Sequence, residues 1–562
     1  MPKIAYNIEG IGNVVVTDNN YLGAGGEANV YAKNDLAIKI YHDPSRMIPI
    51  QKIEELREIK DKRVLVPKHI VYKSGSSPVG YATPFKPDTH PLCKLFTKTF
   101  KVKSGISDDM INNLVVEMQQ TIKNIHKANC LVVDLNEMNE LVSPKFDNIY
   151  FIDVDSYETP SFRATAIMES VRDRQIRKQR WNEGSDWYSF AILSFQMWIG
   201  IHPYKGKHPD YKPAEWTNRM DEGVSVFDPK VILPRTCSDL SVIPKSHIEW
   251  LRDIFVNGAR CSPPDMSDNL LIVVPNSFKF ITASKSFETK LIETCSELIN
   301  RVFNFIGVNY LIGKTNIHRG RAIVPVNIDG ADEVLMCESE GVDPIICIQK
   351  NGIARFYCEK GQEFGSISAN SMMARNGCIY TIYDGRLMEN TFSRMGNKLI
   401  HSCRQSASVM DLSTQMFNGV IIQDILNKKY VTLPYAKGLC AHLPVKELDG
   451  YRILGAKSER NVCAIMAEKS GKYYRFVLSF GATYSNYTVR VVADVPYADI
   501  NLTVMPNGVA VLALEDSVEI FKDEGVKIID NPPFDATKRI FNISGVIHYI
   551  DGKELYTAKM KS

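Results

Sequence analysis

The chain has 562 residues with 44% hydrophobic and 23% charged residues and a net charge of +3, which is the composition of a folded protein with sizeable cores. The near-neutral charge gives no global argument for binding nucleic acid or an acidic membrane surface. No apolar stretch is long enough to span a bilayer or to act as a signal peptide, and the twelve cysteines form no CxxC pair. We therefore expect a cytoplasmic protein with reduced cysteines and no zinc centre.

The first candidate site is a glycine-rich turn between two predicted strands in "LGAGGEANVYAKNDLAIKIY", residues 22–41. Such a turn lets the backbone lie close to phosphates because no Cβ intrudes, although glycine clusters also mark ordinary hairpins. Lys39 stands between apolar residues on the second strand, and a buried lysine requires an anionic partner. The candidate nucleotide-binding residues are Leu22, Gly23, Ala24, Gly25, Gly26, Val30, Ala37 and Lys39.

A helix is predicted over residues 47–60, with its apolar positions clustered on one side. On a helical wheel Glu54 borders the apolar face, Glu58 lies further out and Glu55 points nearly away. Glu54 is therefore the first candidate partner of Lys39 at the nucleotide site, and Glu58 is the second. The alternative is that all three glutamates are solvated.

The next stretch with candidate chemistry is "LVVDLNEMNELV", residues 131–142, which follows a helix predicted over 108–126. Asp134 follows an apolar run, Asn139 comes five positions later, and Asp153 follows a second apolar run beyond a predicted hairpin. An ordinary turn is one interpretation, because Asp and Asn are common in turns. Carboxylate and amide oxygens at such loop ends also suit Mg²⁺, so Asn139 and Asp153 are candidate metal ligands. Asp134 is then free to accept the proton of an attacking hydroxyl.

The texture of the chain changes near residue 280. Before that point, residues 186–200 are apolar nearly all round and end in Gly, which predicts a helix at the centre of a domain. After about residue 320, pairs of short apolar runs flank turns such as "KNG", "YDG" and "KSG". These hairpins start at residues 345, 379, 420, 463, 509 and 546. A period of about 40 residues predicts an all-β domain, a six-bladed β-propeller or, alternatively, a pair of β-sandwiches.

The order and spacing of these motifs resemble the protein-kinase superfamily over about residues 15–275. The similarity is to bacterial kinase-like proteins in which IDxDS replaces DFG. "LGAGGEANVY" resembles the glycine-rich loop, "AIK" the strand lysine motif, "VVDLNEMN" the catalytic loop and "IDVD" at 152–155 the DFG position. "SDWYSFAILSFQMWIGIHPYKG" and "ARCSPP", with Arg260, resemble two later motifs.

The resemblance implies a bilobal α+β kinase-like domain over residues 1–280, with an N-lobe of about 1–88 and a C-lobe of about 89–280. A helix over residues 285–306 is expected to join the two halves within a helical connector at 281–320. The β-propeller-like domain then spans residues 321–562.

The chain also departs from the family pattern. Asp155, at the position of the DFG glycine, is either an extra carboxylate near the metal or a turn cap. No APE motif is found between residues 156 and 185, which leaves Arg260 without an obvious Glu partner. Four further departures are Ala28, Val132, Val133 and Asn136, where the family has Gly, His, Arg and Lys.

The function implied by the resemblance is ATP- and Mg²⁺-dependent phosphotransfer by a serine/threonine-type protein kinase. Asp134 would be the catalytic base, Lys39 would neutralise the α- and β-phosphates, and the β-rich domain would recruit a protein substrate or partner. Neither a nucleic acid nor a membrane is expected as a partner. Two alternatives stay open. The valines before Asp134 favour a pseudokinase-like nucleotide-binding scaffold, and the Asp-x4-Asn spacing is also shared by small-molecule kinases.

Overall fold

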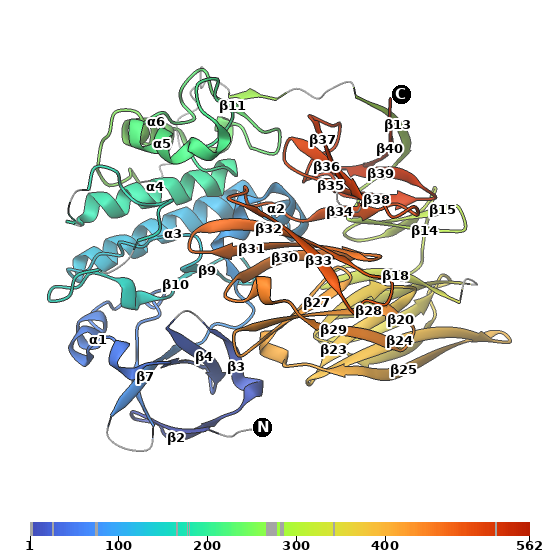
Figure 1. The fold of residues 1–562 in the computed structure, drawn as a ribbon, viewed down its shortest axis with the longest axis horizontal. Coiled ribbons are helices and arrows are strands. Elements are labelled where there is room, and N and C mark those ends of the chain that lie inside the picture. Colours follow the sequence, from blue (N-terminus) through green and yellow to red (C-terminus); the bar gives the residue numbers. More distant parts are fainter. Residues whose placement is uncertain are drawn as a thin grey trace.

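The computed structural model describes residues 4–24, 27–73, 77–164, 167–176, 178, 180–265, 278–281, 286–340, 343–522 and 525–561. Within them, the α-helices lie before residue 256, and small antiparallel sheets fill the chain after residue 286 (Figure 1). Each helix of the described part is too short or too polar to traverse a bilayer.

The first 84 residues build one antiparallel sheet of seven strands, in the order β2-β1-β6-β7-β5-β4-β3. Burial alternates along β1 and β2, as expected for strands with one face on a core. Asn34 and Asp35 both have positive φ and form the tight turn that joins β4 to β5. The strands are β1 (Ile4–Ile8), β2 (Gly12–Val16), β3 (Tyr21–Ala24), β4 (Ala28–Lys33), β5 (Leu36–Tyr41), β6 (His69–Lys73) and β7 (Pro78–Pro84).

The helix predicted over residues 47–60 is real but short, since α1 spans only Ile50–Leu56. The helical part that follows packs around two predicted helices, which are confirmed as α3 (Asp108–Lys127) and α4 (Glu183–Ile199). Gly200 ends α4 with a φ of +91°, a conformation that favours glycine. The remaining elements are β8 (His90–Pro91), α2 (Lys98–Ser104), β9 (Glu140–Val142), β10 (Ile149–Phe151), α5 (Trp216–Glu222), β11 (Ile232–Leu233), α6 (Lys245–Phe255) and β12 (Lys279–Phe280).

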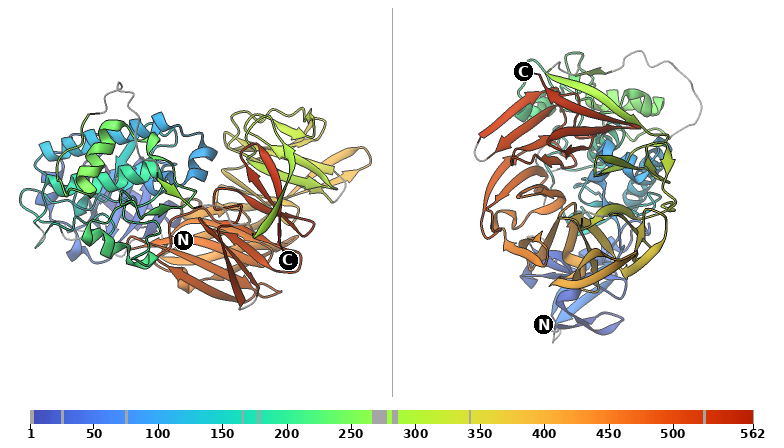
Figure 2. Two further views of the ribbon diagram at one scale, coloured as in Figure 1. Left: turned by 90° about the horizontal axis from the view of Figure 1, so that it is seen from above. Right: turned by 90° about the vertical axis from the view of Figure 1, so that its right-hand side faces the viewer.

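The region after residue 286 consists of seven four-stranded antiparallel sheets in the described residues. They succeed one another around a ring, which the right-hand view of Figure 2 shows. Predicted turns are confirmed at Asn351–Gly352, Asp384–Gly385 and Ser470–Gly471, where both residues have positive φ. The all-β character of this region was therefore predicted correctly from its hairpins.

The strands of the first four sheets are β14 (Arg301–Phe305), β15 (Val308–Ile312), β16 (Ile317–Arg319), β17 (Ala322–Ile323), β18 (Glu333–Ser339), β19 (Asp343–Lys350), β20 (Ile353–Cys358), β21 (Glu363–Ser368), β22 (Ser371–Arg375), β23 (Cys378–Tyr383), β24 (Arg386–Met395), β25 (Lys398–Ser408), β26 (Thr414–Phe417), β27 (Val420–Ile425), β28 (Lys428–Ala436) and β29 (Leu439–Pro444). Those of the last three are β30 (Arg452–Glu459), β31 (Val462–Lys469), β32 (Lys472–Phe480), β33 (Tyr487–Ala493), β34 (Asn501–Val504), β35 (Ala510–Ala513), β36 (Ser517–Lys522), β37 (Gly525–Asp530), β38 (Ile540–Ile543), β39 (Val546–Asp551), β40 (Glu554–Met560) and β13 (Phe287–Thr294).

The number of sheets corrects two predictions. The six predicted repeats miss the sheet β14–β17, because residues 285–306 were expected to form a helix within a helical connector. In the structure this segment contains β13 and β14, and β13 pairs with β40, the last strand of the chain. A short apolar run cannot be assigned to a helix or a strand by periodicity alone, and a partner more than 250 residues away leaves no local signal.

The two halves of the chain share one hydrophobic core. Leu454, Met466 and Tyr473 of the sheet β30–β33 pack into the cluster that also holds the buried residues of α3 and α4. The buried Tyr473 hydroxyl donates to the Glu137 carboxylate at 2.7 Å. Since Glu137 lies between Asp134 and Asn139, this contact ties the ring of sheets directly to the loop with the candidate catalytic residues.

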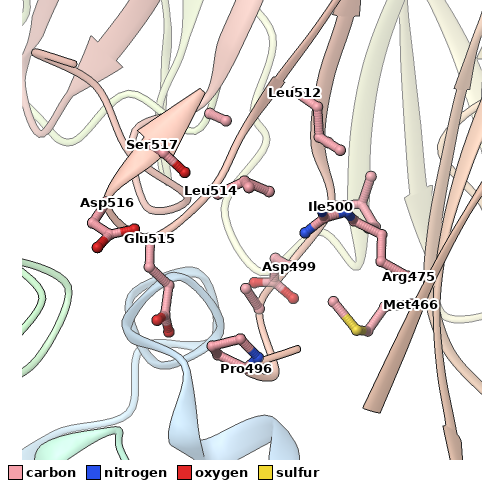
Figure 3. Close-up of a pocket in the computed structure, with 12 residues that line it drawn as sticks. Met466, Arg475, Pro496, Asp499, Ile500, Leu512, Leu514, Glu515, Asp516 and Ser517 are labelled. Atoms are coloured by element: carbon pink, nitrogen blue, oxygen red, sulfur yellow. The ribbon is translucent and has the colours of Figure 1, made fainter. Parts of the chain in front are cut away.

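A cavity of about 100 Å³ lies in the ring of sheets where it meets the first half of the chain (Figure 3). Glu515 lines it and also lines a second cavity together with Phe96 and Thr97, which precede α2. Burial, and then the neighbouring Asp516, raise the pKa of the Glu515 carboxyl to about 7. This carboxyl is therefore a pH-sensitive element of the contact between the halves.

The contribution of Glu515 to the free energy of unfolding is expected to fall as pH rises from about 4.5 to about 7, because the folded protein holds the Glu515 proton that the unfolded chain releases. Glu515→Gln removes this contribution, so its thermal midpoint is expected to fall less over the same window. Thermal unfolding at half-unit pH steps measures both slopes, with the exposed Glu58→Gln as the matched control. Equal slopes in all three proteins would contradict the assignment.

Candidate active site

The predicted lysine and the predicted metal-binding carboxylate lie in direct contact. Lys39, on β5, places its Nζ 2.8 Å from Oδ1 of Asp153 and 2.7 Å from Oδ2 of Asp155. Asp153 has a φ of +56° and precedes a short 3₁₀ helix, Val154–Ser156, directly after β10. Strained backbone of this kind persists where the surrounding structure enforces it, and it is concentrated at functional sites.

The predicted pairing of Lys39 with Glu54 is wrong. Glu54 is exposed, and the face of α1 that points inward carries Lys52, Ile53 and Leu56. Glu58, the second candidate, lies beyond the end of α1 and contacts Lys60 at 3.5 Å. On the helical wheel Glu54 lay at the edge of the apolar face. In the structure that edge of the short helix α1 faces solvent, and Lys52 occupies the inward position.

The two aspartates beside Lys39 have opposite electrostatic character. Desolvation by the surrounding protein, and then the neighbouring Asp155, raise the pKa of Asp153 above its usual range. Burial alone would also raise the pKa of Asp155, but Lys39 and a hydrogen bond from Tyr41 hold it below its usual range. The side chain of Asp153 is 50% exposed and that of Asp155 is 11% exposed. Asp153 is thus the more open carboxylate, and Asp155 is the inner one.

The loop before Asp134 is held by Asp186 of α4. The carboxylate of Asp186 accepts the backbone N–H groups of Val132 and Val133, both at 2.9 Å, and lies 2.9 Å from Nε2 of His126. Val133 has a φ of +61°, which is a strained conformation for a β-branched residue. Both valine side chains are buried, so apolar packing and these backbone hydrogen bonds fix the loop.

Asp134 and Asn139 lie together at the other side of the site. Asn139 donates from Nδ2 to the backbone oxygen of Asp134 at 3.1 Å and to its Oδ2 at 3.3 Å. The backbone N–H of Met168 donates to Oδ1 of Asp134 at 2.7 Å, and burial raises the pKa of this carboxyl. The N–H of Ile152 donates to the carbonyl of Asn139 at 2.8 Å, which brings Asn139 beside Asp153.

Asn139 and Asp153 carry oxygen atoms of the kind that magnesium prefers. Because Asn139 uses its Nδ2 to hold Asp134, its Oδ1 is left as an oxygen ligand. Asp153 pairs with Lys39 through Oδ1 and offers a second carboxylate oxygen. Mg²⁺ prefers a few protein oxygens together with phosphate and water ligands, so Asn139 and Asp153 are the residues that would hold it.

The strands that carry the predicted nucleotide-binding residues lie next to Lys39. Val30 on β4 pairs in register with Lys39 on β5 and with Gly23 on β3. Leu22 and Ala24 belong to β3, and Ala37 lies two residues before Lys39 on β5. The predicted Gly25 and Gly26 lie outside the described residues. The described part of the predicted nucleotide-binding set is therefore gathered on three adjacent strands.

Several residues of the site were missed by sequence reasoning. The Arg260 guanidinium makes two hydrogen bonds of 2.7 Å to the buried carboxylate of Asp173, whereas the sequence had suggested only that a Glu partner is missing. The available signal for this ion pair was an acidic residue, Asp173, in the segment before α4. The contacts of Asp155 with Tyr41 and Lys52 had no such signal, because they join separate elements.

Comparison with known proteins adds no assignment. No family model matches this chain, and no curated protein matches it. The function must therefore be argued from the geometry of the site itself.

Proposed function

We propose that the first half of the chain is an ATP- and Mg²⁺-dependent phosphotransferase of the protein-kinase type, acting on a protein hydroxyl. The observation that carries this proposal is the meeting of Lys39, Asp153, Asn139 and Asp134 at one site, although they come from separate strands and loops. A lysine for phosphates, two oxygen ligands for magnesium and a carboxylate base are the parts that phosphoryl transfer requires.

Three further contacts support the proposal. Asp186 binds two consecutive backbone N–H groups just before Asp134 and so fixes the direction of the catalytic loop. The Asp173–Arg260 pair provides the acidic partner that the resemblance lacked in the sequence. The β9–β10 hairpin joins Asn139 to Asp153 and sets their separation.

In this proposal the protein acts by positioning and by charge stabilisation. Bound Mg²⁺-ATP would supply the transferable phosphoryl group. Lys39 would exchange its contact with Asp153 for the phosphates and would neutralise their charge. Asp134 would accept the proton of the acceptor hydroxyl through Oδ1, after the N–H of Met168 has moved away from that oxygen.

We further propose that the seven sheets form a seven-bladed β-propeller that recruits a protein substrate or partner. The closure of the last sheet by β13 supports this, because it joins the start of the region to its end and pairs the strands around the ring.

The first test is the binding of Mg²⁺-ATP to the full-length protein. A ligand at about 100 times its Kd stabilises a protein by about 2.7 kcal/mol, so the thermal midpoint is expected to rise clearly with Mg²⁺-ATP. The rise should require both ATP and Mg²⁺ and should be lost in Lys39→Met. The exposed Glu54→Gln serves as the control that keeps the wild-type response. The absence of any response in the wild-type protein would contradict the proposed function.

A second candidate function is a nucleotide-binding scaffold that transfers no phosphate. Both carboxylate oxygens of Asp134 already accept hydrogen bonds, one from the backbone of Met168 and one from Asn139. The side chain of Met168 also packs closely against Gly471, since a Cβ added at Gly471 would lie 2.3 Å from Cγ of Met168. Mg²⁺-ATP binding without transfer of labelled phosphate to the protein itself or to generic acceptors would favour this scaffold.

A further inference from the structure

The carboxylate partners of Lys39 do not come from α1. The inward face of α1 carries Lys52, which is 4% exposed, while Glu54 is exposed. The Nζ of Lys52 donates to the backbone carbonyl of Asp155 at 2.7 Å. The helix therefore contributes a cation, and the anion that neutralises Lys39 on the inner side is Asp155.

We propose that Asp155 is the positioning residue for Lys39 and replaces a helix glutamate in that role. This inference rests on the proposed function, because Lys39 is the residue that would bind the phosphates. Asp155 touches neither phosphate nor metal in this account. It acts by holding the ammonium of Lys39 in place while Asp153 turns to the magnesium ion.

The contacts around Asp155 fix its carboxylate from several directions. Its Oδ2 accepts from Nζ of Lys39 at 2.7 Å and from the hydroxyl of Tyr41 at 2.8 Å. Lys52 holds its backbone carbonyl, so main chain and side chain are both anchored. A charged hydrogen bond is stronger than a neutral one, and its geometry is best kept when both partners are fixed.

The surroundings of Lys39 favour a fixed ammonium. Its Nζ lies 5.6 Å from the ring centroid of Tyr41 and 5.7 Å from that of Tyr81, within the range of cation–π attraction. Two aromatic rings and the inner carboxylate thus surround the ammonium on the protein side. The half-exposed Asp153 lies on the open side, where a ligand would approach.

In this arrangement the two neighbouring aspartates have different roles: Asp153 binds the magnesium ion and Asp155 holds Lys39. If Asp153 were the only partner of Lys39, a magnesium ion bound to Asp153 would leave the lysine without a fixed position. With Asp155 in place, Lys39 keeps one short charged contact whether or not Asp153 binds a magnesium ion. The same lysine can then meet the phosphates at a defined point.

The test compares Asp155→Asn and Asp155→Glu with Glu54→Gln in the full-length protein. The first readout is the rate at which an amine-reactive ester modifies Lys39 without nucleotide, measured by peptide mass spectrometry. Loss of the inner carboxylate leaves the ammonium of Lys39 with one carboxylate partner in place of two, so it is held less firmly. We expect Asp155→Asn to accelerate the modification several-fold. Asp155→Glu should restore part of the protection, and Glu54→Gln should match the wild-type protein.

The second readout is the KM for ATP, which should rise in Asp155→Asn more than kcat falls, because the lysine is displaced from the phosphates. A Lys39 modification rate in Asp155→Asn equal to that in Glu54→Gln would overturn the role of Asp155, whatever the activity. Failure of the proposed function has a different signature, namely a wild-type protein that Mg²⁺-ATP does not stabilise.

Discussion

Replacing Asp134 by Asn is expected to lower phosphoryl transfer by about 10²–10⁴-fold, the usual contribution of a general base. Asn keeps the size of the side chain and can still accept the hydrogen bond from Met168 through its amide oxygen. It cannot take the proton of the acceptor hydroxyl. Transfer of labelled phosphate from ATP to an acceptor protein, at saturating Mg²⁺-ATP, measures the loss in kcat.

Two controls make this result specific. Binding of Mg²⁺-ATP should persist in Asp134→Asn, because Lys39 and Asp153 are unchanged and Nδ2 of Asn139 keeps its hydrogen bond to the backbone oxygen of residue 134. The control variant Asp210→Asn changes an exposed residue that pairs with Lys230, and this protein should transfer phosphate at the wild-type rate. Wild-type turnover by Asp134→Asn would exclude Asp134 as the base.

The second large effect is expected on stability, from Asp173→Ala. Asp173 is 1% exposed and receives two hydrogen bonds from Arg260, whose guanidinium also lies 4.2 Å from the ring centroid of Tyr188. Removing one partner of a buried ion pair leaves the other without compensation and costs about 3–5 kcal/mol. Urea unfolding measured by fluorescence should show this loss as a lower midpoint.

The Arg260 partner provides the matched test of coupling. The double variant Asp173→Ala/Arg260→Met should lose less stability than the sum of the two single variants, because it leaves no unpaired buried charge. Asp210→Ala, which breaks the exposed pair with Lys230, should leave the midpoint unchanged. Additive losses at Asp173 and Arg260 would show that the ion pair is not the source of the effect.

The candidate site was predictable where its parts follow apolar runs at short spacing. Asn139 and Asp153 flank the β9–β10 hairpin, and a local hairpin brings its two ends together. Asp134 precedes Asn139 in the same loop. Lys39 was recognisable as a lysine between apolar residues of a strand, but its contact with Asp153 joins residues 114 positions apart in the sequence.

The errors concern contacts between distant elements. The orientation of α1 decides whether Glu54 or Lys52 faces Lys39, and that orientation is set by packing of Ile53 and Leu56 against the rest of the protein. The pairing of Asp173 with Arg260 spans 87 residues, and that of β13 with β40 joins the two ends of the β-rich region. No local pattern encodes the pairing of β13 with β40, and the segment before α4 contains Glu158, Glu169 and Asp173 without marking which of them binds Arg260.

The most direct measurement of the central claim is a crystal structure of the protein with a non-hydrolysable ATP analogue and Mg²⁺. The proposed function predicts a magnesium ion about 2.1 Å from Oδ1 of Asn139 and from a carboxylate oxygen of Asp153. It also predicts that Lys39 contacts the phosphates while it remains hydrogen-bonded to Asp155. A bound nucleotide with Asn139 and Asp153 turned away from the metal would contradict the phosphotransferase assignment.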